Sequence, residues 1–316
     1  MKYYDIFNGD ADGICALHQL RLSEPRDAVL VTGVKRDLRL VEKVEAEAGD
    51  VLTVLDVSMQ ENAEALQRLL ARGVRCQYFD HHYPGDIPSH PALTAVIDTS
   101  PDVCTSLLVD RYLSGQWRPW AVAAAFGDNL DETARVAAAP LQLAAARIEL
   151  LAELGRLLNY NGYGEQIADL VYPPAELYRI VSRHRDPFTF IEEEPAFAAL
   201  RANQAEDQRR AAALQAYAET ASGAVYVLPN AAWSRRLSGT VANDLARARR
   251  ERAHAVLVAR EGGFTVSVRA PRDRPLGADA LCRRFPSGGG RAAAAGINML
   301  AESDLDRFVA EFQRAF

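Results

Sequence analysis

Acidic and imidazole side chains recur between residues 10 and 128, each time just after a predicted structural element. Carboxylates packed together repel one another unless protons or cations lie between them. Carboxylate oxygens with imidazole nitrogens suit Mn²⁺, Mg²⁺, Zn²⁺ or Fe²⁺, and an oxygen-rich set favours Mn²⁺ or Mg²⁺. One or two such ions can bind a phosphate and activate a water for in-line displacement. The candidate residues are, in chain order, Asp10, Asp12, Asp56, Asp80, His81, His82 and Asp128.

The segments that precede these residues alternate between short apolar stretches and amphipathic stretches. This alternation predicts a doubly wound, mainly parallel α/β sheet with helices on both faces. Because such sheets bind ligands outside the carboxyl ends of their strands, the candidate residues are expected to meet at one edge. The expected strands are 3–7, 28–32, 51–55, 74–79 and 94–98, and the expected helices are 13–22, 38–48, 60–72, 103–114 and 119–127.

The remaining residues predict a helical region and a smaller C-terminal α/β domain. Residues 131–185 are expected to be helical, and 192–220 to form one long charged helix. The second domain is expected to contain strands 224–228, 255–259 and 264–269 and helices 239–250, 276–284 and 302–314. The expected domains are therefore 1–188, which carries the metal site, a helical connector at 189–222, and a substrate-binding domain at 223–316.

Two motifs resemble those of a known superfamily. Asp80-His81-His82 after an apolar strand, with Asp10-x-Asp12-Gly13 upstream, resembles the motifs of the DHH phosphoesterases. The glycine-rich run at 287–296 resembles the motif of the DHH-associated C-terminal domain. Members include RecJ single-strand exonucleases, nanoRNases that degrade very short oligonucleotides and pAp, cyclic-di-AMP phosphodiesterases and family II pyrophosphatases. The resemblance covers both expected domains and implies a Mn²⁺-dependent phosphoesterase.

The resemblance also implies roles for the candidate residues. Asp56 would bridge two ions, and His82 would orient the site or contact the scissile phosphate. The fourth-motif carboxylate is Asp128 or Asp131, of which alignment on Gly127-Asp128 favours the first. The implied metal ligands are Asp10, Asp12, Asp56, Asp80, His81 and Asp128, and the implied catalytic residues are Asp56, Asp80, His81 and His82.

Two positions depart from the motifs of the superfamily. Many members have His four residues before the first Asp, where this chain has Ile6, so one of two metal sites is expected to be weak. Asn8 is the nearest polar replacement for that His. The glycine motif often ends in His, where this chain has Arg291. An arginine there cannot bind a metal, but it can hold a phosphate through two hydrogen bonds.

The second domain is expected to bind the phosphate of a substrate. Adjacent glycines let backbone N–H groups approach an anion closely. Arg269 follows Ser267 by two residues at the end of an expected strand, and Ser238 is expected to open a helix. The expected substrate-binding residues are Ser238, Ser267, Arg269, Gly288, Gly289, Gly290 and Arg291.

Composition narrows the class of substrate. The chain has 36 Lys and Arg against 42 Asp and Glu, a net charge of −6, which disfavours a protein that coats nucleic acid. No additional all-β segment of the OB type is visible to hold a long single strand. We therefore expect a short oligonucleotide or small nucleotide as substrate, of the nanoRNA, pAp or cyclic-dinucleotide class. No membrane-length apolar stretch or signal peptide is visible, so a cytoplasmic protein without membrane contact is expected.

Other functions remain open at this level. The loss of His at position 6 is consistent with a catalytically degenerate DHH protein that binds a nucleotide or a replication or repair partner. A RecJ-like single-strand exonuclease is a further alternative. A pyrophosphatase or polyphosphatase is disfavoured because those relatives use the missing His and carry a different C-terminal domain. Dimers occur in the superfamily, so a homodimer is considered, but no segment identifies an interface.

Overall fold

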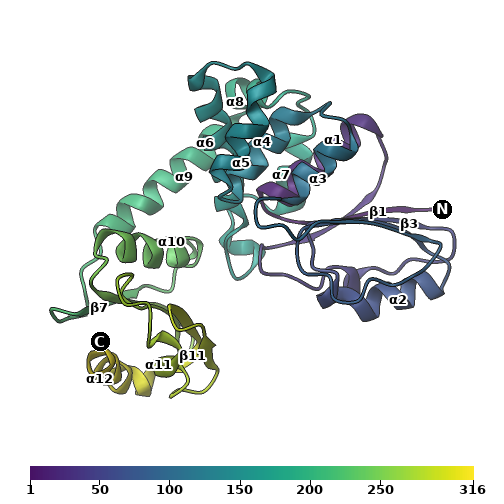
Figure 1. Cartoon of the computed structure of the whole chain (residues 1–316). Coiled ribbons are helices and arrows are strands. Elements are labelled where there is room, and N and C mark those ends of the chain that lie inside the picture. The colour runs from purple at the N-terminus through teal and green to yellow at the C-terminus, as the bar shows by residue number, and fades with distance from the viewer. The chain divides into compact units, whose positions relative to one another are not determined.

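The computed structural model describes residues 1–316, the whole of the chain. It divides into two compact units, Met1–Gln204 and Ala205–Phe316 (Figure 1). Each unit has its own sheet, and the first unit has two hydrophobic cores, whereas the second has one. No helix combines the length and the apolar character that crossing a bilayer would require.

The sheet of the first unit has five strands in the order β2-β1-β3-β4-β5, and every neighbouring pair is parallel. From β1 the chain adds β2 on one side and then β3, β4 and β5 on the other, so the topological switch point lies between β1 and β3. Ligands of doubly wound sheets bind at such a point. The strands are β1 (Tyr3–Asn8), β2 (Val29–Gly33), β3 (Val51–Leu55), β4 (Arg75–Asp80) and β5 (Leu93–Ile97).

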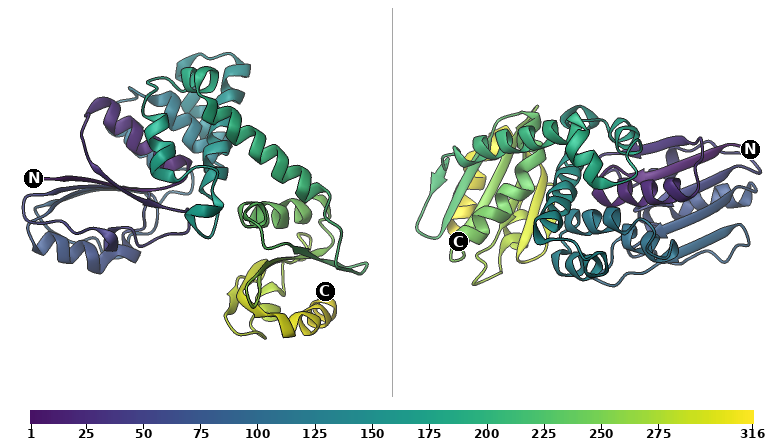
Figure 2. Two further views of the ribbon diagram at one scale, coloured as in Figure 1. Left: turned by 180° about the vertical axis from the view of Figure 1, so that it is seen from behind. Right: turned by 90° about the horizontal axis from the view of Figure 1, so that it is seen from above.

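Helices cover both faces of this sheet, as the alternation of segments predicts. α2 (Ala63–Ala71) lies on one face, and α1 (Ala11–Ser23) lies on the other (Figures 1 and 2). Successive residues of a strand point to opposite faces. Ile6 and Phe7 of β1 are both fully buried and belong to the two different cores. The doubly wound α/β fold expected for this part of the chain is therefore confirmed.

The helices after β5 build up the face of the sheet that α1 covers. The α4–α6 contact needs a glycine, because a Cβ on Gly155 would lie 1.8 Å from the carbonyl oxygen of Ala123. A side chain at this position would push α6 away from α4, and α6 also carries residues that line the site. The helices are α3 (Thr105–Tyr112), α4 (Arg118–Gly127), α5 (Asp131–Ala138), α6 (Ala145–Gly162), α7 (Pro174–Val181), α8 (Pro187–Glu193) and α9 (Pro195–Ala212).

The predicted residue ranges of two helices in this region are wrong. Residues 38–48 contain only one 3₁₀ turn, Val41–Lys43. The side chain of Asn62 explains this, since its Nδ2 donates to the carbonyl of Leu38 and its Oδ1 accepts from the N–H of Val41. Side chains of this type compete with helical hydrogen bonds. The long helix expected at 192–220 is instead α8 and α9, because Pro195 lacks an N–H and begins a new helix.

The second unit is a six-stranded sheet in the order β10-β11-β9-β8-β7-β6. Only β7 and β8 are parallel, and α10 (Ala232–Ala248) connects them. α10 lies on one face, and α11 (Ala278–Cys282) and α12 (Leu305–Ala315) lie on the other (Figures 1 and 2). The strands are β6 (Ala218–Glu219), β7 (Gly223–Leu228), β8 (Ala253–Arg260), β9 (Gly263–Arg269), β10 (Gly288–Gly290) and β11 (Ala294–Ala301).

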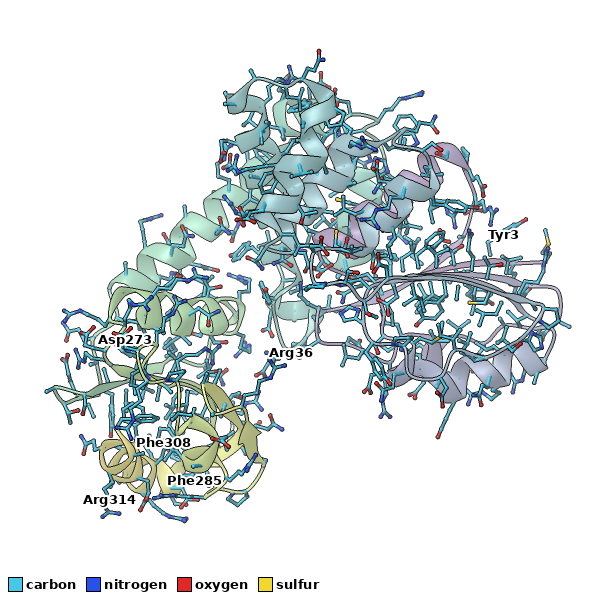
Figure 3. The ribbon with its side chains drawn as sticks, in the orientation of Figure 1. Tyr3, Arg36, Asp273, Phe285, Phe308 and Arg314 are labelled. Carbon is cyan, nitrogen blue, oxygen red and sulfur yellow. The ribbon has the colours of Figure 1, made fainter.

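Aromatic rings fill the core of the second unit on the side of α11 and α12. The ring centroids of Phe285 and Phe308 lie 5.6 Å apart, and both side chains point between the helices and the sheet (Figure 3). Val266 and Val268 of β9 belong to the same core. Because side chains alternate along a strand, Ser267 and Arg269 of β9 must face the opposite side, towards α10.

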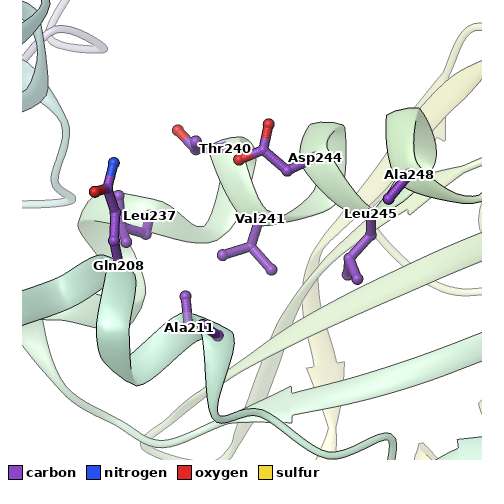
Figure 4. Close-up of a pocket in the computed structure, with 9 residues that line it drawn as sticks. Gln208, Ala211, Leu237, Thr240, Val241, Asp244, Leu245 and Ala248 are labelled. Atoms are coloured by element: carbon purple, nitrogen blue, oxygen red, sulfur yellow. The ribbon is translucent and has the colours of Figure 1, made fainter. Parts of the chain in front are cut away.

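Two expectations for the second unit are also wrong in detail. Gly288–Gly290 form the edge strand β10 and the Ala-rich residues after them form β11, two strands that the expected elements of this domain do not include. α10 begins at Ala232 and not at Gly239, so Ser238 lies inside the helix. Leu237 and Val241 are buried four residues apart, and their helical spacing carries the helix through the Ser-Gly pair. With Ala211 they line an apolar pocket of about 350 Å³ (Figure 4).

Candidate metal centre

The predicted ligands of the first unit converge at the carboxyl ends of β1, β3 and β4. One set of ligand atoms, from Asp12, His81 and Asp128, lies within 4.8 Å of one another. A second set, from Asp56, His81 and His82, meets the same limit. His81 belongs to both sets, so the two describe one continuous cluster.

Asp10 and Asp12 are both held by N–H groups at helix N-termini. Oδ1 of Asp10 accepts from the N–H of Asp12 at 3.0 Å and of Gly13 at 3.1 Å, which caps α1. The two carboxylate oxygens of Asp12 accept from the N–H groups of Thr105 and Ser106, each at 2.7 Å, at the start of α3. Each oxygen has a further lone pair, so Asp12 can bind a cation while it makes these bonds.

Asp56 is the most constrained of the carboxylates. It follows β3 directly and has a φ of 58°, the left-handed region that few non-glycine residues adopt. Its N–H donates to the carbonyl of Phe79 at 3.0 Å, which ties it to β4. Such strain persists only where the surrounding structure holds it in place. It directs the carboxylate towards His81, whose Nε2 lies 3.4 Å from Oδ1 of Asp56.

The hydrogen bonds of His81 determine which nitrogen can bind a metal. Nδ1 lies 2.8 Å from the carbonyl oxygen of Val103. A carbonyl only accepts, so Nδ1 carries the proton and the neutral ring presents the lone pair of Nε2. Nε2 lies 3.4 Å from Asp56 Oδ1 and 3.8 Å from Asp128 Oδ2. A main-chain carbonyl that fixes the tautomer in this way is common behind metal-binding histidines.

Asp80 holds the two histidines that follow it. Its Oδ1 accepts from the N–H of His81 at 2.9 Å and from Nδ1 of His82 at 2.7 Å. Its Oδ2 is fully buried and has no hydrogen-bond partner. The hydrogen bond to Asp80 is the main reason that the pKa of His82 is raised above its ordinary value. The side chain of His82 is 43% exposed, and its Nε2 is left available to contact a substrate.

The geometry favours Asp128 over Asp131 as the fourth carboxylate. Asp128 follows the last residue of α4, and its Oδ2 faces His81. Asp131 begins α5 and instead makes an exposed ion pair with Arg156 at 2.6 Å. Because α4 ends at Gly127, Asp128 lies in the turn that faces His81, whereas Asp131 lies on the exposed surface of α5.

Lys35 is a residue of this cluster that the sequence analysis did not identify. It follows β2 by two residues, and its Nζ lies 2.6 Å from Oδ2 of Asp10 and 3.4 Å from Oδ1 of Asp128. Its position after a strand of the same sheet was the available signal. Asn8, the nearest polar replacement for the missing His, donates from Nδ2 to the carbonyl of Lys35 at 3.3 Å.

Burial and mutual repulsion raise the pKa of two carboxyl groups of the cluster. Desolvation is the largest cause for Asp56, followed by the charges of Asp12, Asp10, Asp128 and Asp80, and together they raise its pKa well above the ordinary value. Desolvation and the charge of Asp12 likewise raise the pKa of Asp128. Burial is the largest single cause for Asp10 and would raise its pKa, but the ammonium of Lys35 and the hydrogen bonds from Gly13 and Asp56 together outweigh it, and the net shift is downward.

These observations fit a bound divalent cation. Ligand atoms about 2.1 Å from a shared ion lie roughly 3.0 to 3.4 Å apart in octahedral or tetrahedral geometry. The separation of His81 Nε2 from Asp56 Oδ1, 3.4 Å, agrees with this, and that from Asp128 is only slightly longer. The partnerless Oδ2 of Asp80 and the raised pKa of Asp56 both indicate negative charge that a cation would neutralise.

The raised pKa of Asp56 predicts how metal-free stability changes with pH. A carboxyl group whose pKa is higher in the folded state stabilises the fold when protonated, and this contribution is lost as pH rises through the folded pKa. In chelator, we therefore expect Asp56→Asn to melt above the wild type, by a margin that grows from about pH 5 to about pH 8. The pKa of Asp10 is lowered, so its contribution to stability changes only at pH values below its ordinary pKa. Asp10 therefore does not affect the difference between the two proteins in this pH range.

Thermal melting of both proteins across this pH range measures the effect. Because the wild type and the variant have every other titrating group in common, the difference in melting temperature reports the charge at position 56 together with its repulsion of the neighbouring carboxylates. In Mn²⁺ the order should reverse, since ligands bind metal in their deprotonated form. A margin in chelator that shrinks as pH rises would contradict the electrostatic description of the cluster.

The second unit contains a separate polar pocket of about 400 Å³. Arg247, Arg269 and Arg272 line it together with Asn243. Arg269 donates from Nε to Oδ1 of Asn243 at 2.9 Å and from Nη1 to the carbonyl of Val268 at 3.1 Å, so its contacts are not with a carboxylate. Burial lowers the pKa of Arg269. A partly buried guanidinium without an acidic partner is suited to an anionic ligand.

The expected substrate-binding residues are partly brought together. Ser267, Gly296 and Gly289 are register partners across β9, β11 and β10, so they share one sheet face with Arg269. No atom lies within 4 Å of the place that a Cβ on Gly289 would occupy, so the sheet is open there. Arg291 is exposed in the turn between β10 and β11, whereas Ser238 lies within α10 and not at its start.

No protein-family model matches the chain, and no curated protein matches it. Solved structures do share its fold. An exonuclease RecJ bound to manganese has a TM-score of 0.64 at 17% identity, over 99% of this chain and 89% of that chain. A pGpG-specific phosphodiesterase, PggH, from Vibrio cholerae has a TM-score of 0.60 at 14% identity, over 100% of both chains.

Two further structures extend the comparison. An exopolyphosphatase-related protein from Bacteroides fragilis has a TM-score of 0.51 at 14% identity, over 99% of this chain and 91% of that chain. RecJ of Thermus thermophilus in complex with Mn²⁺ has a TM-score of 0.54 at 17% identity, but this chain spans only 51% of its length. The TM-scores establish a shared fold, and because the identities are this low the comparison shows the fold alone. It is the fold that the resemblance to the DHH phosphoesterases predicts.

Proposed function

We propose that this protein is a metal-dependent phosphoesterase that hydrolyses phosphodiester or phosphomonoester bonds of short oligonucleotides or small nucleotides. The observation that carries the proposal is the position of Asp56. Its carboxylate is buried among four others and faces the lone pair of His81 Nε2, an arrangement that a divalent cation would neutralise. The predicted residues Asp12, His81 and Asp128 would complete the set of metal ligands around it.

The residues of the cluster divide into those that would hold the metal and those that position them. A bound Mn²⁺ or Mg²⁺ would supply Lewis-acid polarisation of a phosphoryl oxygen and activation of water. Asp80 orients both histidines through its Oδ1. His82, with Nδ1 bound to Asp80 and a raised pKa, can present a proton from Nε2 to a phosphate oxygen or to the leaving oxygen.

The second unit supports a small nucleotide as substrate. The pocket around Arg269 holds about 400 Å³, which is in the size class of small-molecule sites. Its three arginines can hold a terminal phosphate, and on the same sheet face the structure is open at Gly289. Ser267, Arg269, Gly288, Gly289, Gly290 and Arg291 are the residues proposed for this contact.

Two structural neighbours support a phosphoesterase, and one of them supports this substrate class. RecJ is an exonuclease that was solved with manganese, and PggH is a pGpG-specific phosphodiesterase. The whole of PggH is covered by this chain, whereas one RecJ is about twice as long. A compact protein of this length thus suffices for a dinucleotide substrate in at least one protein of the same fold.

A substrate panel tests the proposal. Purified protein with Mn²⁺ is given pAp, pApA, pGpG, cyclic-di-AMP, a long single strand and pyrophosphate, and product formation is followed by chromatography. We expect hydrolysis of one or more of the mono- and dinucleotides that stops when the metal is chelated. Faster turnover of the long strand would favour a RecJ-like exonuclease. Metal binding without hydrolysis of any substrate would favour a degenerate nucleotide-binding protein.

A further inference from the structure

Lys35 places a cation inside the carboxylate cluster. Its Nζ contacts three oxygens, Oδ2 of Asp10 at 2.6 Å, Oδ1 of Asn159 at 2.9 Å and Oδ1 of Asp128 at 3.4 Å. An ammonium group has three hydrogens to donate. The three contacts therefore match its donor capacity and give it the surroundings that a bound metal ion would have.

The main chain of Lys35 is fixed on both sides. Its N–H donates to the carbonyl of Gly162, at the end of α6, at 2.9 Å. Its carbonyl accepts from Nδ2 of Asn8, the last residue of β1, at 3.3 Å. The ring of Tyr163 lies 5.7 Å from Nζ and holds the Nδ2 of Asn159 through its hydroxyl at 3.3 Å. Lys35 is therefore part of the built site and not a surface lysine that reaches the acids by chance.

The candidate ligands that Lys35 leaves available can hold one metal ion. Asp10 differs from Asp12 because its Oδ2 lies against the ammonium of Lys35, so a metal ion beside that oxygen would meet a second positive charge. Both candidate sets of ligand atoms, the one with Asp56 and the one with Asp12 and Asp128, include His81. The Nε2 of His81 has a single lone pair and can bind only one ion at a time. Ile6, fully buried in the apolar core, offers no further ligand beside Asp10.

We propose that the ε-ammonium of Lys35 takes the place of one divalent cation, so that the centre binds a single ion at Asp12, Asp56, His81 and Asp128. This inference rests on the proposed function, because it assumes that the cluster binds metal. It adds that Asp10 is neutralised by a lysine of the same chain. Occupancy by metal should therefore follow a simple one-site curve in Mn²⁺ concentration.

The number of Mn²⁺ ions bound per chain tests this inference. Native mass spectrometry and Mn²⁺ electron paramagnetic resonance titration count the ions on the intact protein, independently of activity. We expect one ion on the wild type and on Lys35→Arg. In Lys35→Met, the oxygens of Asp10, Asn159 and Asp128 lose their cation, so we expect a second ion. Lys43→Met is the matched control, because Lys43 pairs with Asp37 on the exposed surface and its removal should leave the count at one.

Thermal melting supplies a second readout. Lys35→Met should melt below the wild type in chelator and gain more from Mn²⁺, and Lys35→Gln replaces it if the methionine variant does not fold. Two ions on the wild type, or one ion on both Lys35→Met and Lys35→Gln, would overturn the inference while the metal-dependent function stands. A wild type that binds no Mn²⁺ would overturn the proposed function and this inference together.

Discussion

Asp56→Asn is expected to remove metal-dependent hydrolysis, with a loss of kcat/KM of at least about 100-fold. That figure is the upper range for groups that only support metal ligands, and Asp56 is placed to bind the ion directly. The amide keeps the size of the side chain but loses the negative charge and one oxygen. Mn²⁺ affinity, measured by isothermal titration calorimetry, should fall with the activity. Steady-state kinetics on the best substrate of the panel measures the loss.

The control for this variant is Asp110→Asn. Asp110 is also a buried carboxylate, but it lies in α3 and makes its ion pair with Arg118 at 3.0 Å, outside the acidic cluster. Its replacement should cost stability and leave Mn²⁺ affinity and kcat/KM close to the wild type. If Asp56→Asn retained wild-type affinity and turnover, Asp56 would have no role at a metal centre.

Arg269→Ala is expected to lower kcat/KM by about 10- to 100-fold, because hydrogen bonds to charged groups contribute about 1.5 to 3 kcal/mol. Most of the loss should lie in KM, since the guanidinium would hold a part of the substrate that does not react. Metal affinity should not change, because Arg269 belongs to the other unit. Kinetics and calorimetry on the same preparation separate the two effects.

Arg283→Ala is the matched control for Arg269→Ala. Arg283 lies at the end of α11, and its side chain is 65% exposed beside Asp279. Its removal takes the same charge from the same unit without touching the pocket. Equal losses in the two variants would show that only the net charge of the unit matters and would contradict a phosphate site at Arg269.

The convergence of the candidate metal ligands was predictable because parallel strands end at a common edge. Short apolar segments mark the strands, and each candidate carboxylate or imidazole follows one of these strands or the end of a helix beside them. Asp10, Asp56 and Asp80 needed no knowledge of side-chain packing to be placed together. The choice between Asp128 and Asp131 did need it, because only the turn after α4 decides which carboxylate faces His81.

Other features depend on contacts between residues far apart in the sequence. Lys35 enters the cluster because Gly162 and Asn8 fix its main chain, and neither contact leaves a local pattern. The expected helix at 38–48 is replaced by bonds to the side chain of Asn62. Gly288–Gly290 become a strand through pairing with β11, whereas glycine by itself favours loops.

A crystal grown in Mn²⁺ tests the central claim most directly, through anomalous scattering at the manganese absorption edge. The claim is that buried carboxylates from separate strand ends are neutralised by a divalent cation. It predicts an anomalous peak within bonding distance of Asp56, His81 and Asp128. A crystal of active, fully folded protein with no peak among these side chains, or with manganese bound elsewhere, would contradict it.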